Sequence, residues 1–591
     1  MSLRTIDRFT QLLALLLLAS LATPLLAQGD EPQSLFIDRV DVNVINVEVF
    51  VTDRQGNRVT DLTAEDFEIS EDGQPVEISN FYSVAYEDQV LKGLDRDRAA
   101  IEAGNTPAAT ARPADQQLNL VVYVDHFNLS PQNQKRVLDN LGGFLEDRVN
   151  QGDQIMLVGY NRKVKVVQPF TRDRARVLDG LNKLKKTATY RQVDEQQRRE
   201  VMRRIAPSPS GRGIPTTSPD QAYMHLRAYV EQARLDLRAS TTALASVVRS
   251  LAGMPGRTSV LYVSDGLPKR PGEDLYQVLS DLYGVEGFES NGAQIDPLIE
   301  SLNENQSQIL NNIIRHANAH QVTLYTLDAR GTRGASTESA QYNVLTPAPG
   351  GRTGQDAINT FSYQESLLDL SDATGGTAIL NTFNFDGAFA DLSEDLDSFY
   401  SLGYRSKHGG DGEYHKIDVR VKRPGLKVRH RAGFVDKPEQ ERVADRTFSS
   451  LLFNMESNPL GIALDFGQPD KQGRKQFHLP ILVRIPFDNI TLLPNGDNVE
   501  GRLKIFIAVQ DEKGAISDLQ EIPYPVQIPA AQTAAAKGQQ VGYQTTLLIR
   551  EGVPKIAVGV WDELSGDESF VHKSVLVGKP PKGATITRSG R

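Results

Sequence analysis

Uninterrupted apolar runs, several ending in an acidic residue, mark the middle of the chain. LNLVVYVD covers 118–125, IMLVGY covers 155–160 and SVLYVSDG covers 259–266. Apolar residues at helical spacing separate the runs, as in 137–149. Buried strands of a parallel sheet have this continuous apolar character. Strands alternating with helices predict a doubly wound, mostly parallel α/β domain with helices on both faces, over residues 118–398.

Alternation with a period of two takes over on both sides of this domain. Residues 36–88 predict a small N-terminal β unit, and 399–435 predict a β-hairpin extension. Each piece alone has few strands for independent stability. We therefore expect 399–435 to pair with 36–83, so that the α/β domain is inserted into one β unit. Strand-rich residues 449–578 predict a C-terminal antiparallel β-sandwich.

Polar or Pro/Gly-rich segments separate and interrupt these units. Within the α/β domain we expect a charged, helical insertion at 187–237 and two polar, loop-like insertions at 267–306 and 331–364. Loops after strand ends build the binding face of such folds, so these insertions are candidate specificity elements. The remaining boundaries are linkers at 89–117 and 436–448 and a tail at 579–591.

The first residues have the pattern of a secretory signal. Arg4 and Arg8 precede an apolar run at 12–26, and Ala27 is a small residue at its end. The run is shorter than the roughly 20 residues of a membrane helix. We expect a signal peptide at 1–27, with an uncleaved anchor as the alternative. The mature protein would then be extracytoplasmic, whether periplasmic, cell-surface or secreted, with no integral membrane segment.

Composition narrows the function classes. The chain has 591 residues, 65 of them basic and 75 acidic, for a formal net charge of −10, and no cysteine. An acidic balance argues against a nucleic-acid partner. The basic run 420–431 alternates with Val and Leu, so a solvated strand face is the first interpretation. Without cysteine, disulfides, Cys-ligated zinc and thiol catalysis are excluded.

Several motifs in a fixed order resemble a von Willebrand factor A (VWA) domain. They are LNLVVYVDHFNLS, QPFTRD, PGRTSVLYVSDGL, VTLYTLDARG and ATGGTAILNTFN. More narrowly, the chain is similar to VWA-related proteins secreted by some bacteria, over about residues 36–435. The resemblance implies protein binding through Mg²⁺ or Mn²⁺ at the end of the sheet. The usual metal site has D-x-S-x-S, a later Thr and a later Asp.

The residues at these positions depart from that pattern. The two acids are present, but Phe127 and Leu129 stand where the serines are expected. Asn128 and Ser130 lie one residue further on, and on a straight strand they would point away from the face of Asp125. A bulge or an early loop would turn them back. The candidate site consists of Asp125, Asn128, Ser130, Ser240, Thr241 and Asp265, with Asp125, Ser130, Thr241 and Asp265 as the candidate metal ligands.

A purely structural interpretation of the same residues stays open beside the metal site. Asp125 would cap nearby loop amides, Ser130 would cap the helix that follows, and Asp265 would order the turn with Gly266. Asp328, at the end of another strand, is similarly expected to cap its loop.

Other motifs add little chemistry. His316 and His320 share a helix face, but the segment lacks the Glu of H-E-x-x-H, so zinc is not expected there. Thr374-Gly375-Gly376 predicts a turn before a strand rather than a phosphate loop. No G-x-S-x-G is present.

We therefore expect a non-enzymatic protein–protein interaction, adhesion or scaffold protein with an unknown protein ligand. It would carry a degenerate form of the metal-ion-dependent adhesion site. One alternative is an envelope glycan- or polymer-binding protein that acts through the C-terminal sandwich, where Trp561 is either core or a sugar platform. A minor alternative is a metal-dependent hydrolase.

Overall fold

The computed structural model describes residues 44–84, 118–205, 218–283, 289–290, 293–294, 296–331, 351–512 and 514–578. The predicted signal at 1–27, the linker at 89–117 and the tail at 579–591 lie outside these residues. Of the described helices, none is both long and apolar enough to cross a membrane.

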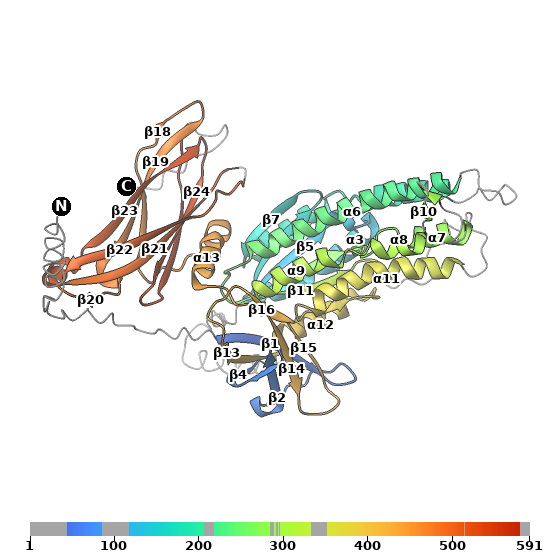
Figure 1. The fold of residues 1–591 in the computed structure, drawn as a ribbon, viewed down its shortest axis with the longest axis horizontal. Helices are drawn as coiled ribbons and strands as arrows, with labels where there is room; N and C mark the ends of the chain where they lie inside the picture. Colours follow the sequence, from blue (N-terminus) through green and yellow to red (C-terminus); the bar gives the residue numbers. More distant parts are fainter. Residues whose placement is uncertain are drawn as a thin grey trace, which may run out of the picture.

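A six-stranded, mostly parallel sheet, called the central sheet below, lies at the heart of the α/β region (Figure 1). From edge to edge its strands are β12 (Ala378–Ile379), β11 (Val322–Asp328), β8 (Arg257–Ser264), β5 (Leu118–Asp125), β6 (Gln154–Tyr160) and β7 (Val164–Thr171). Only the edge strand β7 runs antiparallel to its neighbour among these six. Every residue of β5 is buried, as its continuous apolar sequence predicts. The expectation of a mixed α/β fold with a mostly parallel sheet is confirmed.

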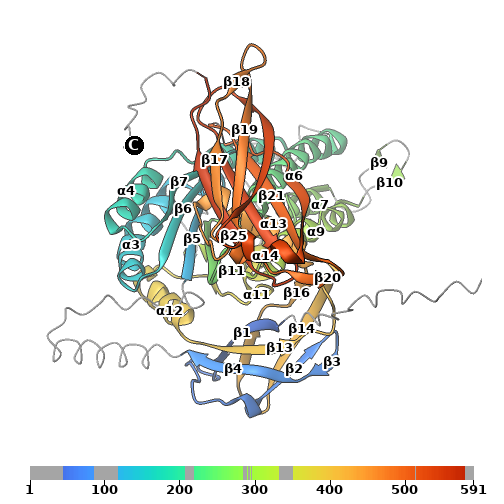
Figure 2. The ribbon, with the colours of Figure 1, turned by 90° about the vertical axis from the view of Figure 1, so that its left-hand side faces the viewer.

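Helices cover both faces of the central sheet (Figure 2). One apolar core joins the sheet to three helices, α3 (Pro131–Asn150), α4 (Arg174–Lys185) and α12 (Phe385–Asp397). A second core, on the other face, joins it to α6 (Pro219–Ser250), α9 (Ser307–Ala319) and α11 (Gly351–Asp372).

The insertions contain more helix than the sequence pattern predicted. The expectation of loops at 267–306 is wrong, because α7 (Glu273–Tyr283) and α8 (Pro297–Asn303) lie there with two short strands, β9 (Glu289–Ser290) and β10 (Ala293–Gln294). The described part of 331–364 belongs to α11. Apolar residues of α7 pack against α6 and α5 (Arg191–Ile205) in a small core of their own. This core explains why short, mostly polar segments form stable helices.

The segments before and after the α/β region pair with one another in the structure. The pieces 44–84 and 399–435 together make two four-stranded antiparallel sheets around a shared apolar core, called the β unit below. One sheet has the order β15 (Lys427–His430), β1 (Val44–Thr52), β13 (Phe399–Arg405) and β4 (Ile78–Val84). The other has the order β16 (Gly433–Val435), β14 (Tyr414–Val421), β2 (Phe67–Glu71) and β3 (Gln74–Val76).

Residues 436–448, expected as a linker, instead form most of helix α13 (Glu439–Phe453). The helix is stabilised by packing: Val443 contacts Phe506 and Phe570, and Leu451 lies against small residues of the C-terminal sheets. Phe453 also makes an edge contact with Phe170 beside the central sheet, with ring centroids 5.3 Å apart. The helix therefore connects two domains rather than merely separating them.

The C-terminal region consists of two antiparallel sheets that share one apolar core, called the C-terminal sandwich below (Figures 1 and 2). The first contains β17 (Ala463–Phe466), β18 (Asp470–Lys471), β19 (Gln476–Pro486) and β23 (Gln540–Arg550). The second contains β20 (Leu493–Asn495), β21 (Asn498–Gln510), β22 (Gln520–Pro529), β24 (Lys555–Asp562) and β25 (Glu568–Ser574). A short helix, α14 (Thr533–Ala536), precedes β23.

Candidate functional site

Asp125 ends strand β5 and is buried at the carboxyl end of the central sheet. The chain then enters a 3₁₀ turn, η3 (His126–Asn128), which folds the next residues back toward it. Oδ1 of Asp125 accepts a hydrogen bond from the Asn128 backbone N–H at 3.1 Å. Its Oδ2 accepts from Asn128 Nδ2 at 2.9 Å and from the Tyr262 hydroxyl at 2.6 Å. Burial raises the pKa of Asp125, and these hydrogen bonds counteract part of the rise.

Asn128 connects this carboxylate to helix α6. Its Nδ2 also donates to Ser240 Oγ at 3.0 Å, so one side-chain amide bridges an acid and a hydroxyl. Asp125, Asn128, Ser240 and Tyr262 are joined by buried hydrogen bonds and are called the acid network below. Buried polar groups of this kind are stable only when they are paired.

Asp265 follows β8 and lies at the start of helix α3 rather than in the acid network. Its Oδ2 accepts from the Ser130 backbone N–H at 2.9 Å, and its Oδ1 accepts from Asn133 Nδ2 at 2.8 Å. The carboxylate therefore caps the positive end of α3. Burial raises the pKa of Asp265, while the positive charge of Arg191 opposes the rise. Ser130 is the N-cap residue, but its own side chain makes no capping bond to the described helix.

The six predicted site residues therefore fall into a group of three, a pair and one separate residue. The structure brings Asp125, Asn128 and Ser240 together, and it joins Asp265 to the backbone of Ser130. Thr241 donates its hydroxyl to the carbonyl of Leu237, one turn earlier in the same helix, at 2.8 Å.

A divalent cation does not fit this arrangement. Mg²⁺ prefers six oxygen ligands near 2.1 Å. Asp125 already accepts three hydrogen bonds, and Thr241 is committed to its own helix. Phe127 and Leu129, at the serine positions, are buried side chains without oxygen. The side-chain amide of Asn128 donates to Asp125 Oδ2, so an N–H group already occupies the oxygen that a cation would need.

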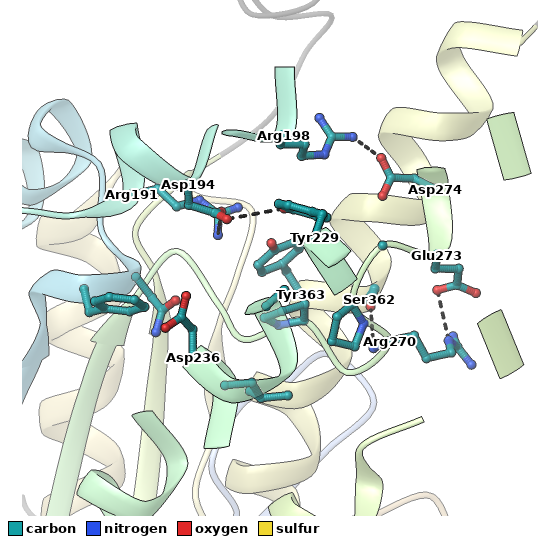
Figure 3. A pocket seen from close by; sticks show the side chains of 17 residues that line it. Arg191, Asp194, Arg198, Tyr229, Asp236, Arg270, Glu273, Asp274, Ser362 and Tyr363 are labelled. Atoms are coloured by element: carbon teal, nitrogen blue, oxygen red, sulfur yellow. Dashed lines mark hydrogen bonds and ion pairs between the residues drawn. The ribbon is translucent and has the colours of Figure 1, made fainter. Parts of the chain in front are cut away.

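A cavity that sequence reasoning missed lies directly beside the acid network (Figure 3). It encloses about 40 Å³ between Phe127 and Asn128 at the sheet end and residues of α5, α6, α11 and the loop before α7. Buried Arg191 lies over the ring of Tyr363, 4.5 Å from its centroid. Tyr229 contacts Asp194 at 3.3 Å.

Charged pairs hold the elements around this cavity together. Arg198 on α5 pairs with Asp274 on α7, and Arg270 pairs with Glu273 at 2.9 Å. The pair of Arg198 and Asp274 escapes sequence analysis because the two residues are 76 positions apart. The one available signal was the charged, helical character of 187–237.

The other sequence candidates serve structural roles in the described chain. Asp328 accepts from the guanidinium of Arg330 at 2.8 Å through each of its two oxygens, and from Gln364 at 2.9 Å. Nδ1 of His320 lies 3.0 Å from the ammonium of Lys437. Burial and the charge of Lys437 lower the pKa of His320 to about 3. Thr374 accepts the Leu324 N–H at 3.0 Å, which fixes the turn before β12.

Two surface expectations need correction. The basic run 420–431 is only partly a solvated face, because Arg431 is buried and Arg429 Nη2 donates to both oxygens of Asp395, at 2.6 and 2.7 Å. The guanidinium of Arg429 also lies over the ring of Phe50, 4.5 Å from its centroid. Trp561 is half-buried in the small cluster under α13, with the Lys504 ammonium 5.5 Å from its ring centroid.

Comparison with known proteins yields structural likeness only. No family model matches the chain, and no curated protein matches it. A mussel byssus structure, proximal thread matrix protein 1 with a zinc-occupied MIDAS motif, is 12% identical, over 48% of this chain and 49% of that one, with a TM-score of 0.21. The chain thus spans about half the length of the mussel proteins it matches first.

Two structures from Porphyromonas gingivalis are also similar. The vWF domain of the type V pili tip protein Mfa5 is 12% identical, over 48% of this chain and 96% of that one, with a TM-score of 0.23. Three N-terminal domains of Mfa5 are 8% identical, over 91% of this chain and 77% of that one, with a TM-score of 0.24. The first of these structures is a domain of the type that the sequence motifs resemble.

Proposed function

We propose that this chain is a non-enzymatic, extracytoplasmic protein-binding protein, acting in adhesion or as a scaffold. Its partner would bind at the carboxyl end of the central sheet, across the helices of the insertions. The acid network beneath would be a degenerate metal site that shapes the surface without a cation. The partner is a protein of unknown identity.

The distribution of exposed apolar side chains carries this proposal. Of the sixteen large apolar side chains exposed among the described residues, seven lie on α5, α6, α8 and α11: Val193, Met224, Leu235, Ile299, Leu302, Phe361 and Leu368. In the sequence, Leu235 precedes Asp236 and Phe361 precedes Ser362, and both of these following residues line the cavity. A contiguous group of exposed apolar side chains with a polar rim marks an interaction site, and these helices carry more such side chains than any other part of the described chain.

The size of the cavity points the same way. Small-molecule sites usually enclose about 300–1,000 Å³. The cavity beside the acid network encloses about 40 Å³, close to the space of one water molecule. A cavity of this size favours the binding of a macromolecular surface rather than of a small molecule at this position.

Site-specific photo-crosslinking tests the proposal. A photo-reactive amino acid at Leu235 or Phe361 is expected to trap one protein from the extracytoplasmic fraction of the source organism. Leu548 on β23 of the C-terminal sandwich is a control of similar exposure outside the α/β region. A partner trapped at Leu548 but not at Leu235 and Phe361 would contradict this location.

A further inference from the structure

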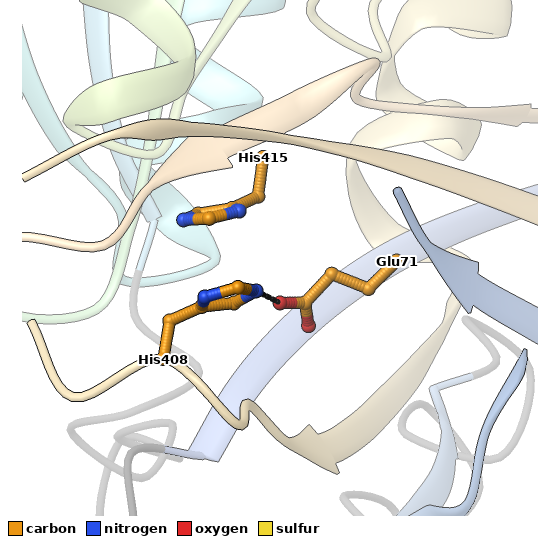
Figure 4. Close-up of side chains that lie close together, drawn as sticks. All are labelled: Glu71, His408 and His415. Atoms are coloured by element: carbon orange, nitrogen blue, oxygen red, sulfur yellow. Dashed lines mark ion pairs between the residues drawn. The ribbon is translucent and has the colours of Figure 1, made fainter. Parts of the chain in front are cut away.

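Three potential metal ligands from distant parts of the chain meet in the β unit (Figure 4). Glu71 ends β2, His415 lies on β14, and His408 lies on the connection between β13 and β14. One oxygen of Glu71 and one ring nitrogen of each histidine all lie within 4.8 Å of one another. We call these three residues the histidine cluster.

Carboxylates surround both imidazole rings. His408 Nε2 lies 3.1 Å from Glu71 Oε1, and its Nδ1 lies 3.4 Å from Asp411. His415 Nδ1 lies 2.8 Å from Asp72, and its Nε2 lies 3.2 Å from Asp411. All four ring nitrogens therefore face a carboxylate oxygen. A neutral imidazole has only one N–H to donate, so the cluster holds more acceptors than donors.

Glu71 shows the imbalance most directly. The residue is 5% exposed, and its Oε1 accepts a hydrogen bond from Ser406 Oγ at 3.1 Å while it lies beside His408 Nε2. Its Oε2 and the buried hydroxyl of Tyr404 have no hydrogen-bond partner of normal geometry among the described residues. A buried carboxylate needs enough donors, or a cation, to offset the loss of hydration.

We propose that Glu71, His408 and His415 bind one divalent transition-metal ion, with Zn²⁺ as the reference ion. Two imidazoles and a carboxylate are a donor set that suits zinc, whereas Mg²⁺ and Ca²⁺ prefer oxygen alone. Three protein ligands leave one position of a tetrahedral ion for water. Asp72 and Asp411 act as the carboxylates that orient metal-bound imidazoles through their remaining nitrogens.

The ring geometry sets one requirement on binding. The two imidazoles stack with centroids 3.8 Å apart and planes 22° from parallel. Nearly parallel rings cannot both direct an in-plane lone pair at one ion, so one ring must tilt. The side chain of His408 is 37% exposed, and the residue belongs to the connection between β13 and β14. Its ring is therefore the one that can turn.

The position of the cluster assigns the ion a structural role. It would tie Glu71, which precedes the α/β region, to two residues that follow that region. The two halves of the β unit are otherwise joined by strand pairing, as between Glu71 and Ile417. Cross-links that close long loops constrain the unfolded chain most. In a chain without cysteine, a metal is the remaining cross-link of this kind.

Calorimetry with Zn²⁺ tests the site in the untagged, chelator-treated protein lacking residues 1–27. We expect one Zn²⁺ per chain and a rise in the melting temperature of the β unit. His408→Ala and His415→Gln should each weaken binding by about 10–100-fold or more. His478→Ala, on β19 of the C-terminal sandwich, should leave it unchanged.

Cobalt provides a readout that does not depend on stability. Bound Co²⁺ should give visible absorption bands that disappear in His408→Ala, a half-exposed position where truncation leaves the fold intact. No binding at 100 µM Zn²⁺, or binding equally strong in both histidine variants, would overturn the proposal. Both results are independent of the protein partner proposed above.

Discussion

Two clusters of buried acidic groups in this protein are balanced in opposite ways. At the end of the central sheet, Asp125 is surrounded by donors, the amide of Asn128 and the hydroxyl of Tyr262. In the β unit, Glu71 receives one hydroxyl donor, Ser406 Oγ, at 3.1 Å, and its Oε2 has no hydrogen-bond partner of normal geometry among the described residues. The comparison teaches that the number of acids does not decide whether a site needs a cation. The donors around them decide it.

The largest expected effect comes from removing the acid of the balanced cluster. Asp125→Ala removes the carboxylate that accepts from the backbone and side-chain amide of Asn128 and from the buried hydroxyl of Tyr262. We expect the free energy of unfolding of the α/β region to fall by about 3 kcal/mol. Urea denaturation with and without 5 mM Mg²⁺ measures this. A loss below about 1 kcal/mol would show that the acid network contributes little.

Reversing the polarity of one partner sharpens the comparison. Asn128→Asp replaces the N–H donors with a second carboxylate against Asp125, so we expect a loss of about 2–3 kcal/mol at neutral pH. Mg²⁺ should restore part of it, because two adjacent carboxylates attract a hard cation. Melting curves with and without Mg²⁺ test this. Asn128→Ala is the control, and it should lose stability without any response to Mg²⁺.

The buried histidine His320 extends the same contrast to the pH dependence of stability. His320 faces the donor Lys437, and its pKa is lowered to about 3 in the folded chain. Below pH 6.5 the unfolded chain gains a proton here that the folded chain refuses. Stability present above pH 6.5 is therefore lost as the pH falls toward 3. His320→Gln should reduce the loss between pH 7 and 4.5 by about 1–2 kcal/mol. Parallel melting curves for both proteins would contradict this.

The smallest effect on stability is expected at the proposed partner surface. Leu235 and Phe361 are 49% and 59% exposed. Leu235→Ser and Phe361→Ser should change the free energy of unfolding by less than about 0.5 kcal/mol. The same variants should abolish partner crosslinking from neighbouring positions such as Val193. Unchanged crosslinking would separate these side chains from the interface.

The sequence predicted the central sheet well and the contacts at its end poorly. The apolar run 118–125 predicts a buried strand that ends in Asp125. The similar run 259–266 predicts a second strand with Asp265 at its end. That Asn128 turns back to Asp125 does not follow from these runs, because strand alternation places it on the opposite face. The structure ends the strand at Asp125 and continues with a 3₁₀ turn, so the early loop that the sequence left open as an alternative brings Asn128 back.

The remaining misses involve long-range partners. The sequence predicts a linker over 436–448 because apolar residues are few there. The burial of those that lie on α13 depends on strands more than 50 residues later. The histidine cluster depends on the register that places Glu71 opposite Ile417. Neither His408 nor His415 stands in a recognisable metal motif, so only the pairing of the β unit brings them to Glu71.

The most direct test of the central claim is calorimetric titration of Mg²⁺ into the protein lacking residues 1–27, with Asp265→Ala as the matched variant. If the donors of Asn128 and Tyr262 complete the acid network, both proteins should give the same heats, without a binding transition up to millimolar Mg²⁺. A one-site binding curve that Asp265→Ala abolishes would contradict the account and restore the predicted metal site.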